Sequence, residues 1–104
     1  MKYGNKQTAA SDGTVFPSKR ECARYEELLL LDRMGKITAI RTQVPFELIP
    51  KQDGERSCSY IADFTYLDDR GFFHCEDTKG FRTKDYVIKR KLMLWLKKIR
   101  IEEI

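Results

Sequence analysis

Residues 58–80 read CSYIADFTYLDDRGFFHCEDTKG, and this stretch decides the fold. Its first ten residues are rich in aromatic and β-branched side chains, which predicts a strand over 58–67. The acidic residues and glycine at 68–71 predict a hairpin turn. The stretch FFHCEDTK at 72–79 is then the returning strand, and Gly80 ends it.

The hairpin is expected to bring two acidic side chains together. A three-residue loop with Gly71 in the left-handed conformation is a common connection, and it places Asp63 opposite Asp77. Residues two apart in a strand share a face, so Lys79 projects beside Asp77. Two carboxylates that face each other repel. We therefore expect either the Lys79 ammonium group or a divalent cation such as Mg²⁺ to compensate their charge.

The chain before the hairpin predicts a helix and two short strands. Ser18, followed three residues later by Glu21, fits a capping box. With a glycine just beyond its end, this signal predicts a helix over 19–34. Two short runs, at 36–41 and 44–49, have the composition of strands.

After the hairpin, a second helix and a last strand are predicted. Thr83 fits the N-cap of a helix over 84–98, whose apolar residues at helical spacing form the expected core face. These residues are Ile88, Leu92, Trp95, Leu96 and Ile99. Residues 99–104 predict a final strand. With 44–49 as the strand before the hairpin and 36–41 as an additional candidate, the order αβββαβ indicates a single-domain α/β core with a mixed sheet over 16–104, preceded by an arm or short hairpin over 1–15.

Composition narrows the class of protein. The chain has 104 residues and no run of about 18 apolar residues, so we expect one domain and no membrane partner. Its three cysteines form no CxxC pair and His74 is the only histidine, which argues against a disulfide scaffold or zinc site and for a cytoplasmic location. The net charge is +4, but residues 79–100 carry +8 and the other 82 residues carry −4. This distribution indicates a polyanionic partner such as nucleic acid.

Asp63, Asp77 and Lys79 on one sheet face suit the hydrolysis of a phosphodiester. Carboxylates and a backbone carbonyl, here that of Thr78, bind Mg²⁺, and a lysine beside the metal can orient the attacking water. Glu21 has two interpretations: a structural capping-box residue, or an inward-facing ligand for the metal or its water. The alternative for the strand residues is a structural ion pair between Asp77 and Lys79, with Asp63 capping a loop.

These residues stand in an order that resembles the core of the PD-(D/E)XK nucleases. In that superfamily an acidic residue on the second strand, an acid-x-Lys motif on the third and often a glutamate on the first helix form the active site. Here those positions hold Asp63, Asp77 with Lys79, and Glu21. More narrowly, residues 3–103 resemble a family of small phage-encoded proteins of uncharacterised function placed in that superfamily. The resemblance rests on Asp12-Gly13, Phe16-x-Ser18-Lys19-x-Glu21, Arg24-Tyr25, Gln43-x-x-Phe46-Glu47-Leu48, Tyr60-x-Ala62-Asp63-Phe64-x-Tyr66 and Glu76-Asp77-x-Lys79-Gly80.

The resemblance implies a restriction-endonuclease-like fold and a Mg²⁺-dependent endodeoxyribonuclease, with Mn²⁺ as a substitute metal and no nucleotide cofactor. The metal ligands that it implies are Glu21, Asp63, Asp77 and Thr78. Lys79 would orient the attacking water, and Gln43 would be an accessory active-site residue. The basic residues expected to contact the DNA backbone are Lys84, Lys89, Arg90 and Lys91. One departure is that Ala62 precedes Asp63, where the superfamily name has proline.

The sequence leaves other functions open. A nuclease selective for Holliday-type junctions is the nearest, and a chain this small would then act as a homodimer. A second alternative is a DNA-binding accessory protein without catalysis, and a third is a purely structural protein. A phage-encoded nuclease would act in DNA replication, recombination or processing in the host cytoplasm.

Overall fold

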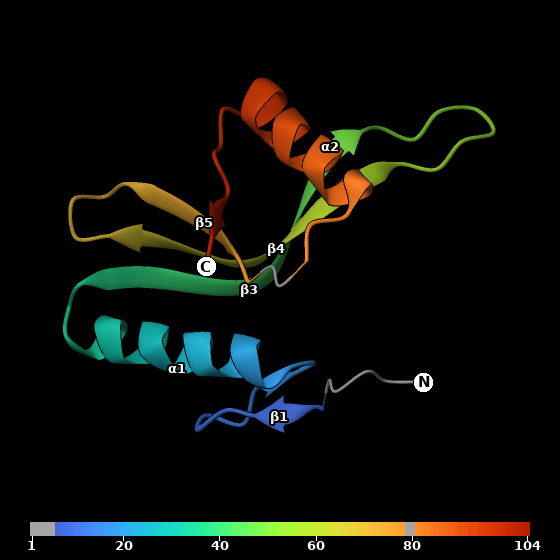
Figure 1. Cartoon of the computed structure of the whole chain (residues 1–104). Helices are drawn as coiled ribbons and strands as arrows, with labels where there is room; N and C mark the ends of the chain where they lie inside the picture. The colour runs from blue at the N-terminus through green and yellow to red at the C-terminus, as the bar shows by residue number, and fades with distance from the viewer. Residues whose placement is uncertain (1–5, 79–80) are drawn as a thin grey trace.

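The computed structural model describes residues 6–78 and 81–104 of the chain. Its elements in chain order are β1 (Thr8–Ala9), β2 (Val15–Phe16), α1 (Lys19–Arg33), β3 (Ile37–Ile49), β4 (Cys58–Asp68), β5 (Phe73–Asp77), α2 (Lys84–Leu92), the π-helical segment η1 (Met93–Lys97) and β6 (Glu102–Glu103). After the small β1–β2 hairpin, the order is the αβββαβ predicted from the sequence, in a mixed α/β fold (Figure 1).

The main sheet has four strands in the order β3-β4-β5-β6. The first three are antiparallel and β6 lies parallel to β5, so the sheet is mixed, as expected. The β4–β5 hairpin has the predicted register, with Phe64 paired to Glu76 and Leu67 to Phe73. Gly71 in the turn has φ +85°. In this register, Asp63 and Asp77 are the next residues to face each other.

Strand β3 corrects the prediction of two short strands, because it is one strand of 13 residues. Strand β4 pairs with both halves, Thr42 with Phe64 and Val44 with Ala62. Between these pairs lies Gln43, whose φ of 52° is in the left-handed region. A single residue in this conformation bends a strand and leaves the ladder intact on either side. The apparent break in the sequence is therefore a bend in one strand.

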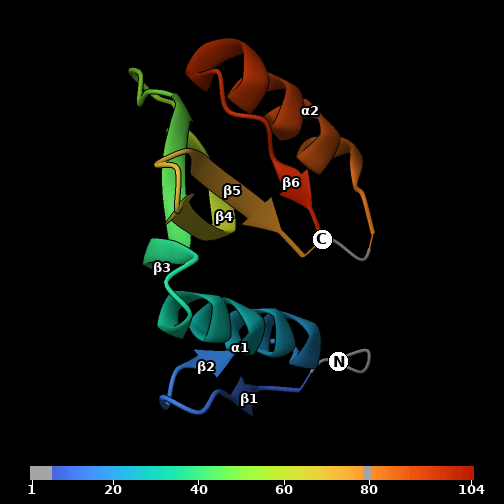
Figure 2. The same cartoon turned by 90° about the vertical axis from the view of Figure 1, so that its left-hand side faces the viewer.

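Two hydrophobic clusters share the sheet, one beneath each helix, and α1 and α2 lie on opposite sides of it (Figure 2). The α1 cluster contains Phe64 and Tyr66 of β4. The α2 cluster contains Tyr60 and Ala62 of the same strand. All four have even numbers, so a regular strand would place them on one face. The alternation therefore inverts at Asp63, opposite the bend in β3.

Helix α1 begins at the predicted residue and ends within one residue of the predicted end. The Ser18 hydroxyl accepts the Glu21 backbone N–H at 3.2 Å, which confirms the N-cap. Gly35 has φ +75°, a conformation that favours glycine after a helix. The helix ends at Arg33, one residue before the predicted end.

The second helix departs from its prediction. It is α-helical only to Leu92 and continues as a π-helix over Met93–Lys97. The predicted core face is correct only in part. Leu92 and Ile99 pack against the α2 cluster, but Ile88, Trp95 and Leu96 are exposed, Trp95 by 69%, and Met93 is fully buried. A π-helix has i→i+5 hydrogen bonds, so residues after Met93 rotate away from their α-helical positions. Among the described residues, no helix has the length and apolar character needed to cross a membrane.

Candidate active site

The two carboxylates predicted to face each other line one cleft at the end of β5. This carboxylate cleft has a volume of about 290 Å³. Its lining residues come from β4, β5 and the start of α2: Ser59, Tyr60, Ile61, Asp63, Asp77, Thr83, Asp85, Tyr86 and Lys89. The register of the hairpin brings Asp63 and Asp77 together, and helix α2 covers one side of the cleft.

Asp63 is held in place by Thr78. The Thr78 backbone N–H and its hydroxyl both donate to Asp63 Oδ2, at 2.8 and 2.9 Å. The sequence predicted a different role for Thr78, in which its backbone carbonyl is a ligand of the metal. These two hydrogen bonds fix the orientation of the Asp63 carboxylate.

Asp77 is nearly buried, with 3% exposure, and Tyr60 orients it. The Tyr60 hydroxyl donates to Asp77 Oδ2 at 2.7 Å. Burial and the bond to Asp77 raise the pKa of the Tyr60 phenol far above its ordinary value, so it remains a protonated donor at neutral pH. Tyr60 was not among the site residues predicted from the sequence. Regular alternation would turn Tyr60 away from the Asp77 face, and only the inversion at Asp63 brings it there.

The neighbouring acid, Glu76, points to the opposite side of the sheet. It is fully buried, and Arg24 of α1 donates to its two carboxylate oxygens at 2.8 and 2.6 Å. The Tyr66 hydroxyl donates to it as well. The bond to Glu76 is the main reason that the pKa of Arg24 is raised. Glu76 is thus a structural partner of α1, outside the carboxylate cleft.

Glu21 lies on the face of α1 that is directed at the end of β5. It is three residues before Arg24 and so shares that residue's helix face. Arg24 is bonded to β5 through Glu76. Glu21 therefore lies one turn of α1 before the residue that bonds to β5. It is not, however, among the described residues that line the carboxylate cleft.

Of the two remaining predicted site residues, the structure describes Gln43 but not Lys79. Gln43 is exposed on β3 and lies across the ladder from Asp63, between the pairs formed by Thr42 and Val44. It is therefore next to the cleft, at the bend of the strand. Lys79 lies outside the described residues, so its role beside Asp77 stays a prediction.

The four predicted DNA-contacting residues all lie on α2, but they line different cavities. Lys89 lines the carboxylate cleft. Lys84 lines a neighbouring groove, and Lys91 lines a third cavity, beside Arg100. Arg90 donates to Glu103 at 3.1 Å. Lys89 is thus the one member of this group that lines the cleft with the two carboxylates.

Glu103 of β6 accepts hydrogen bonds from three residues in and just before α2. Arg82 donates through Nε and Nη2, at 2.8 and 2.6 Å, and Tyr86 donates at 2.7 Å. Arg90 adds the bond already described. Together, and led by Arg82, these donors lower the pKa of Glu103 to about 2. The network ties the start of α2, and with it one wall of the cleft, to the sheet.

Within residues 6–78 and 81–104, no three His, Cys, Asp or Glu side chains are grouped closely enough to hold a metal ion. Asp63, Asp77 and Asp85 all line the cleft but do not form such a group, so the cleft offers the facing strand residues Asp63 and Asp77 as a pair. Mg²⁺ commonly binds proteins through one or two carboxylates, with water and substrate phosphate completing its coordination. The chemistry of this donor set fits such an ion.

Comparison with known proteins gives a family without an assigned activity. A family model described as "Protein of unknown function (DUF1064)" matches residues 1–102. The comparisons with curated proteins and with solved structures gave no match.

Proposed function

The chain belongs to the DUF1064 family, and we propose from its site that it is a metal-dependent endodeoxyribonuclease. The observation that carries the proposal is the carboxylate cleft. Two acids from adjacent strands open into one cavity, each oriented by a hydrogen-bond donor, with Lys89 beside them. The resemblance to PD-(D/E)XK nucleases supports the same conclusion and suggests a restriction-endonuclease-like fold and a role in phage or mobile-element DNA processing.

Asp63 and Asp77 would hold the metal, Mg²⁺ or Mn²⁺, while Thr78 and Tyr60 keep the two carboxylates in position. A bound divalent ion supplies Lewis-acid stabilisation of the charge that develops on the phosphate. Lys89 lines the same cleft and would neutralise part of the charge of the entering phosphate. Ordered donors behind each carboxylate reduce the reorganisation that the reaction requires.

Glu21 and Lys79 complete the proposed site. With Glu21 one helix turn before Arg24, we assign it a contact through water rather than direct ligation. Lys79 would orient the attacking water, as its place in the acid-x-Lys motif implies. Gln43, across the ladder from Asp63, would contact the substrate at the edge of the cleft.

The test is cleavage of linear duplex, single-stranded and four-way-junction DNA in Mg²⁺, in Mn²⁺ and in EDTA. We expect metal-dependent cleavage by the wild-type protein. Asp77→Asn should lower the rate on the order of 10³-fold, because metal stabilisation of the transition state is worth several kcal/mol. DNA binding should persist in this variant.

The matched control is Asp69→Asn, which removes an exposed acid from the β4–β5 turn, away from the cleft. It should cleave at the wild-type rate. Wild-type cleavage by Asp77→Asn, with its melting temperature unchanged, would refute the assignment of the site. Preference for the four-way junction would identify the junction-selective alternative, and the dimer that it requires would then be visible by sedimentation.

One observation favours a second function, a DNA-binding protein without catalysis. Three described acids line the cleft, Asp63, Asp77 and Asp85, yet they form no group of three metal-ligating side chains. Such a protein would bind DNA equally in EDTA and in Mg²⁺, and would leave every substrate intact.

A further inference from the structure

A second groove adjoins the carboxylate cleft. Its volume is about 360 Å³, and its lining residues are Arg82, Thr83, Lys84, Val87 and Ile88. Thr83 lines both the groove and the cleft. A ligand whose phosphate lies between Asp63 and Asp77 could therefore extend past Thr83 into this groove.

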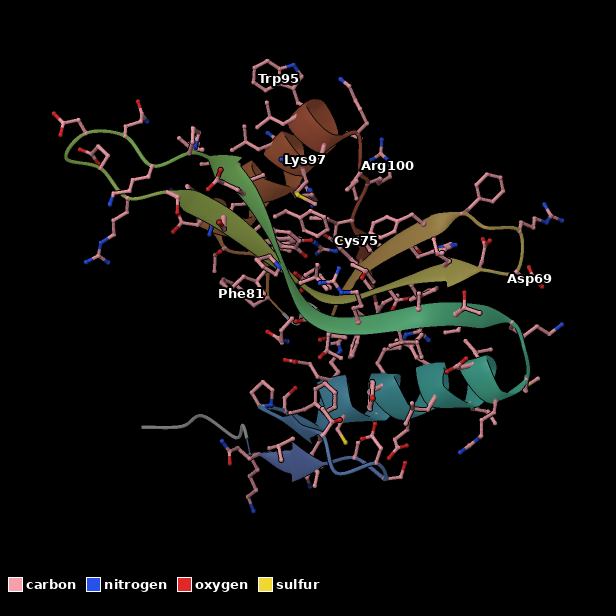
Figure 3. All side chains as sticks on the ribbon, turned by 180° about the vertical axis from the view of Figure 1, so that it is seen from behind. Asp69, Cys75, Phe81, Trp95, Lys97 and Arg100 are labelled. Atoms are coloured by element: carbon pink, nitrogen blue, oxygen red, sulfur yellow. The ribbon has the colours of Figure 1, made fainter. Side chains whose placement is uncertain are left out.

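The surface around the groove is unusually apolar for an exposed region. Ile88 is 57% exposed, and Phe81, which directly precedes the groove residues, is 77% exposed. Figure 3 shows the Phe81 ring standing out beside the β3–β4 ribbon, at the opposite end of α2 from Trp95. Exposed apolar surface beside a polar cleft is typical of a binding site.

Arg82 adds a flat, fixed, charged group to this surface. Its Nε and Nη2 both donate to Glu103 Oε1, which fixes one edge of the guanidinium group. The side chain nevertheless remains 57% exposed. A guanidinium plane held in this way can stack on a nucleobase. Lys84 adds a second positive charge at the rim, where it can meet a phosphate.

We propose that Phe81 and this groove bind an unpaired nucleobase of DNA, next to the phosphate that enters the carboxylate cleft. The ring, the apolar floor and the fixed guanidinium group match the flat, apolar faces of a base, and the two cations match the charged backbone beside it. Base faces in a duplex are already stacked on one another. The substrate class is therefore single-stranded DNA, or DNA with an unpaired nucleotide at the cut. The proposal rests on the proposed function for the position of the phosphate.

The test measures binding in EDTA, where no metal-dependent cleavage occurs. A labelled oligo-dT strand and a blunt duplex of equal length are titrated with wild-type protein, Phe81→Ala and Phe81→Trp. We expect tighter binding to the single strand, and a loss of about 5- to 150-fold in Phe81→Ala, the range that corresponds to the loss of one base–aromatic stack. Phe81→Trp should restore the affinity, and duplex binding should be the same in all three proteins.

Phe72→Ala is the matched control, because Phe72 is 63% exposed beside the β4–β5 turn, away from α2. Equal affinities of Phe81→Ala and Phe72→Ala for oligo-dT would overturn the proposal, as would tighter binding of wild type to the duplex. Failure of the proposed function is a separate result. Loss of single-strand affinity in Phe81→Ala, in a protein that cleaves no DNA, would uphold the groove and refute the nuclease.

Discussion

At the residue scale, the two adjacent acids Glu76 and Asp77 show how environment assigns different roles to similar side chains. Glu76 is enclosed by Arg24 and Tyr66 and connects α1 to the sheet. Asp77 accepts a hydrogen bond from Tyr60 and lines a cleft. The side-chain alternation of β5 separates them. Only the acid on the cleft side is therefore positioned for chemistry.

The role of Tyr60 is testable by removal of one oxygen atom. In Tyr60→Phe, Asp77 loses the donor that orients it, and groups that orient a metal ligand typically contribute 10- to 100-fold to metal affinity or activity. We therefore expect the Mg²⁺ concentration for half-maximal cleavage to rise about tenfold or more. A purely structural Tyr60 would lower the melting temperature and leave the Mg²⁺ requirement unchanged, which would contradict the assignment.

At the element scale, the parts of the fold that depend on local signals were predictable. The turn ending at Gly71 set the register of β4 and β5, and through it the meeting of Asp63 and Asp77 in one cleft. Ser18 and Gly35 marked the ends of α1. The bend at Gln43 and the π-helix from Met93 carry no comparable local signal, because packing against the two clusters determines them. Those features decide which side Tyr60 and Trp95 face, so the sequence analysis missed Tyr60 as a site residue and placed Trp95 wrongly in the core.

The bend in β3 predicts opposite effects of two substitutions at one position. Gln43 has φ 52°, a conformation that costs an ordinary residue about 1 kcal/mol and a β-branched residue more. Gln43→Gly should raise the free energy of unfolding by about that amount, and Gln43→Val should lower it. Urea denaturation measures both.

Arg41→Gly is the control for this pair, because Arg41 is exposed on the same strand and is not among the positive-φ residues. There, glycine should destabilise by roughly 0.5–1 kcal/mol. Destabilisation of the same sign and size in Gln43→Gly would show that the left-handed conformation is not the determinant. A separate fall in the cleavage rate of Gln43→Gly would support the accessory role of the glutamine side chain.

His74 links three strands and predicts a pH-dependent stability. Its Nδ1 lies 2.7 Å from Glu102 Oε2 on β6, and its Nε2 lies 2.8 Å from Asp68 Oδ2 on β4. The Tyr66 ring stacks on it with centroids 5.0 Å apart. The bonds to the two carboxylates, that to Asp68 foremost, raise the pKa of His74 above its ordinary 6.5. The charged imidazolium therefore stabilises the fold fully below pH 6.5, and this stabilisation is lost as pH rises through the raised pKa.

The measurement is the difference in the free energy of unfolding between wild type and His74→Gln. It should be larger at about pH 5.5 than at about pH 8.5. On the acid side, the histidine bond lowers the pKa of Asp68 below 3.8, so the contribution of that carboxylate is lost only as pH falls through the lowered pKa. A difference that is constant from pH 5.5 to 8.5 would show that the two hydrogen bonds do not depend on the charge of His74.

At the scale of the whole molecule, the basic C-terminal third does not form one continuous surface. The residues of 79–100 include nine lysines and arginines. Arg90 and Lys91 line another cavity and neither lines the carboxylate cleft or the groove that adjoins it. Among the residues that the structure describes, the cations beside the cleft and its adjoining groove are Arg82, Lys84 and Lys89. The positive charge that these residues place beside bound DNA is therefore smaller than the nine basic residues of the sequence suggest.

This count predicts the salt dependence of binding to a single strand. Each phosphate contact contributes about −0.7 to the slope of log affinity against log salt, so three contacts give about −2. Titrations of an oligonucleotide at several salt concentrations measure the slope. A value near −6, which contacts from nearly all nine basic residues would produce, would show that the DNA wraps around α2.

The sharing of β4 between two hydrophobic clusters has a consequence for how the molecule opens. Each cluster, with its own helix, has the features of a cooperative unit, and Asp63 stands at the boundary between them. Cooperative units can unfold separately below the global transition and expose their amides to exchange. Opening of the α2 unit would carry Lys89 away from Asp77, while α1 kept its helical hydrogen bonds. On heating, the protein would then lose the activity of the site at a lower temperature than most of its secondary structure.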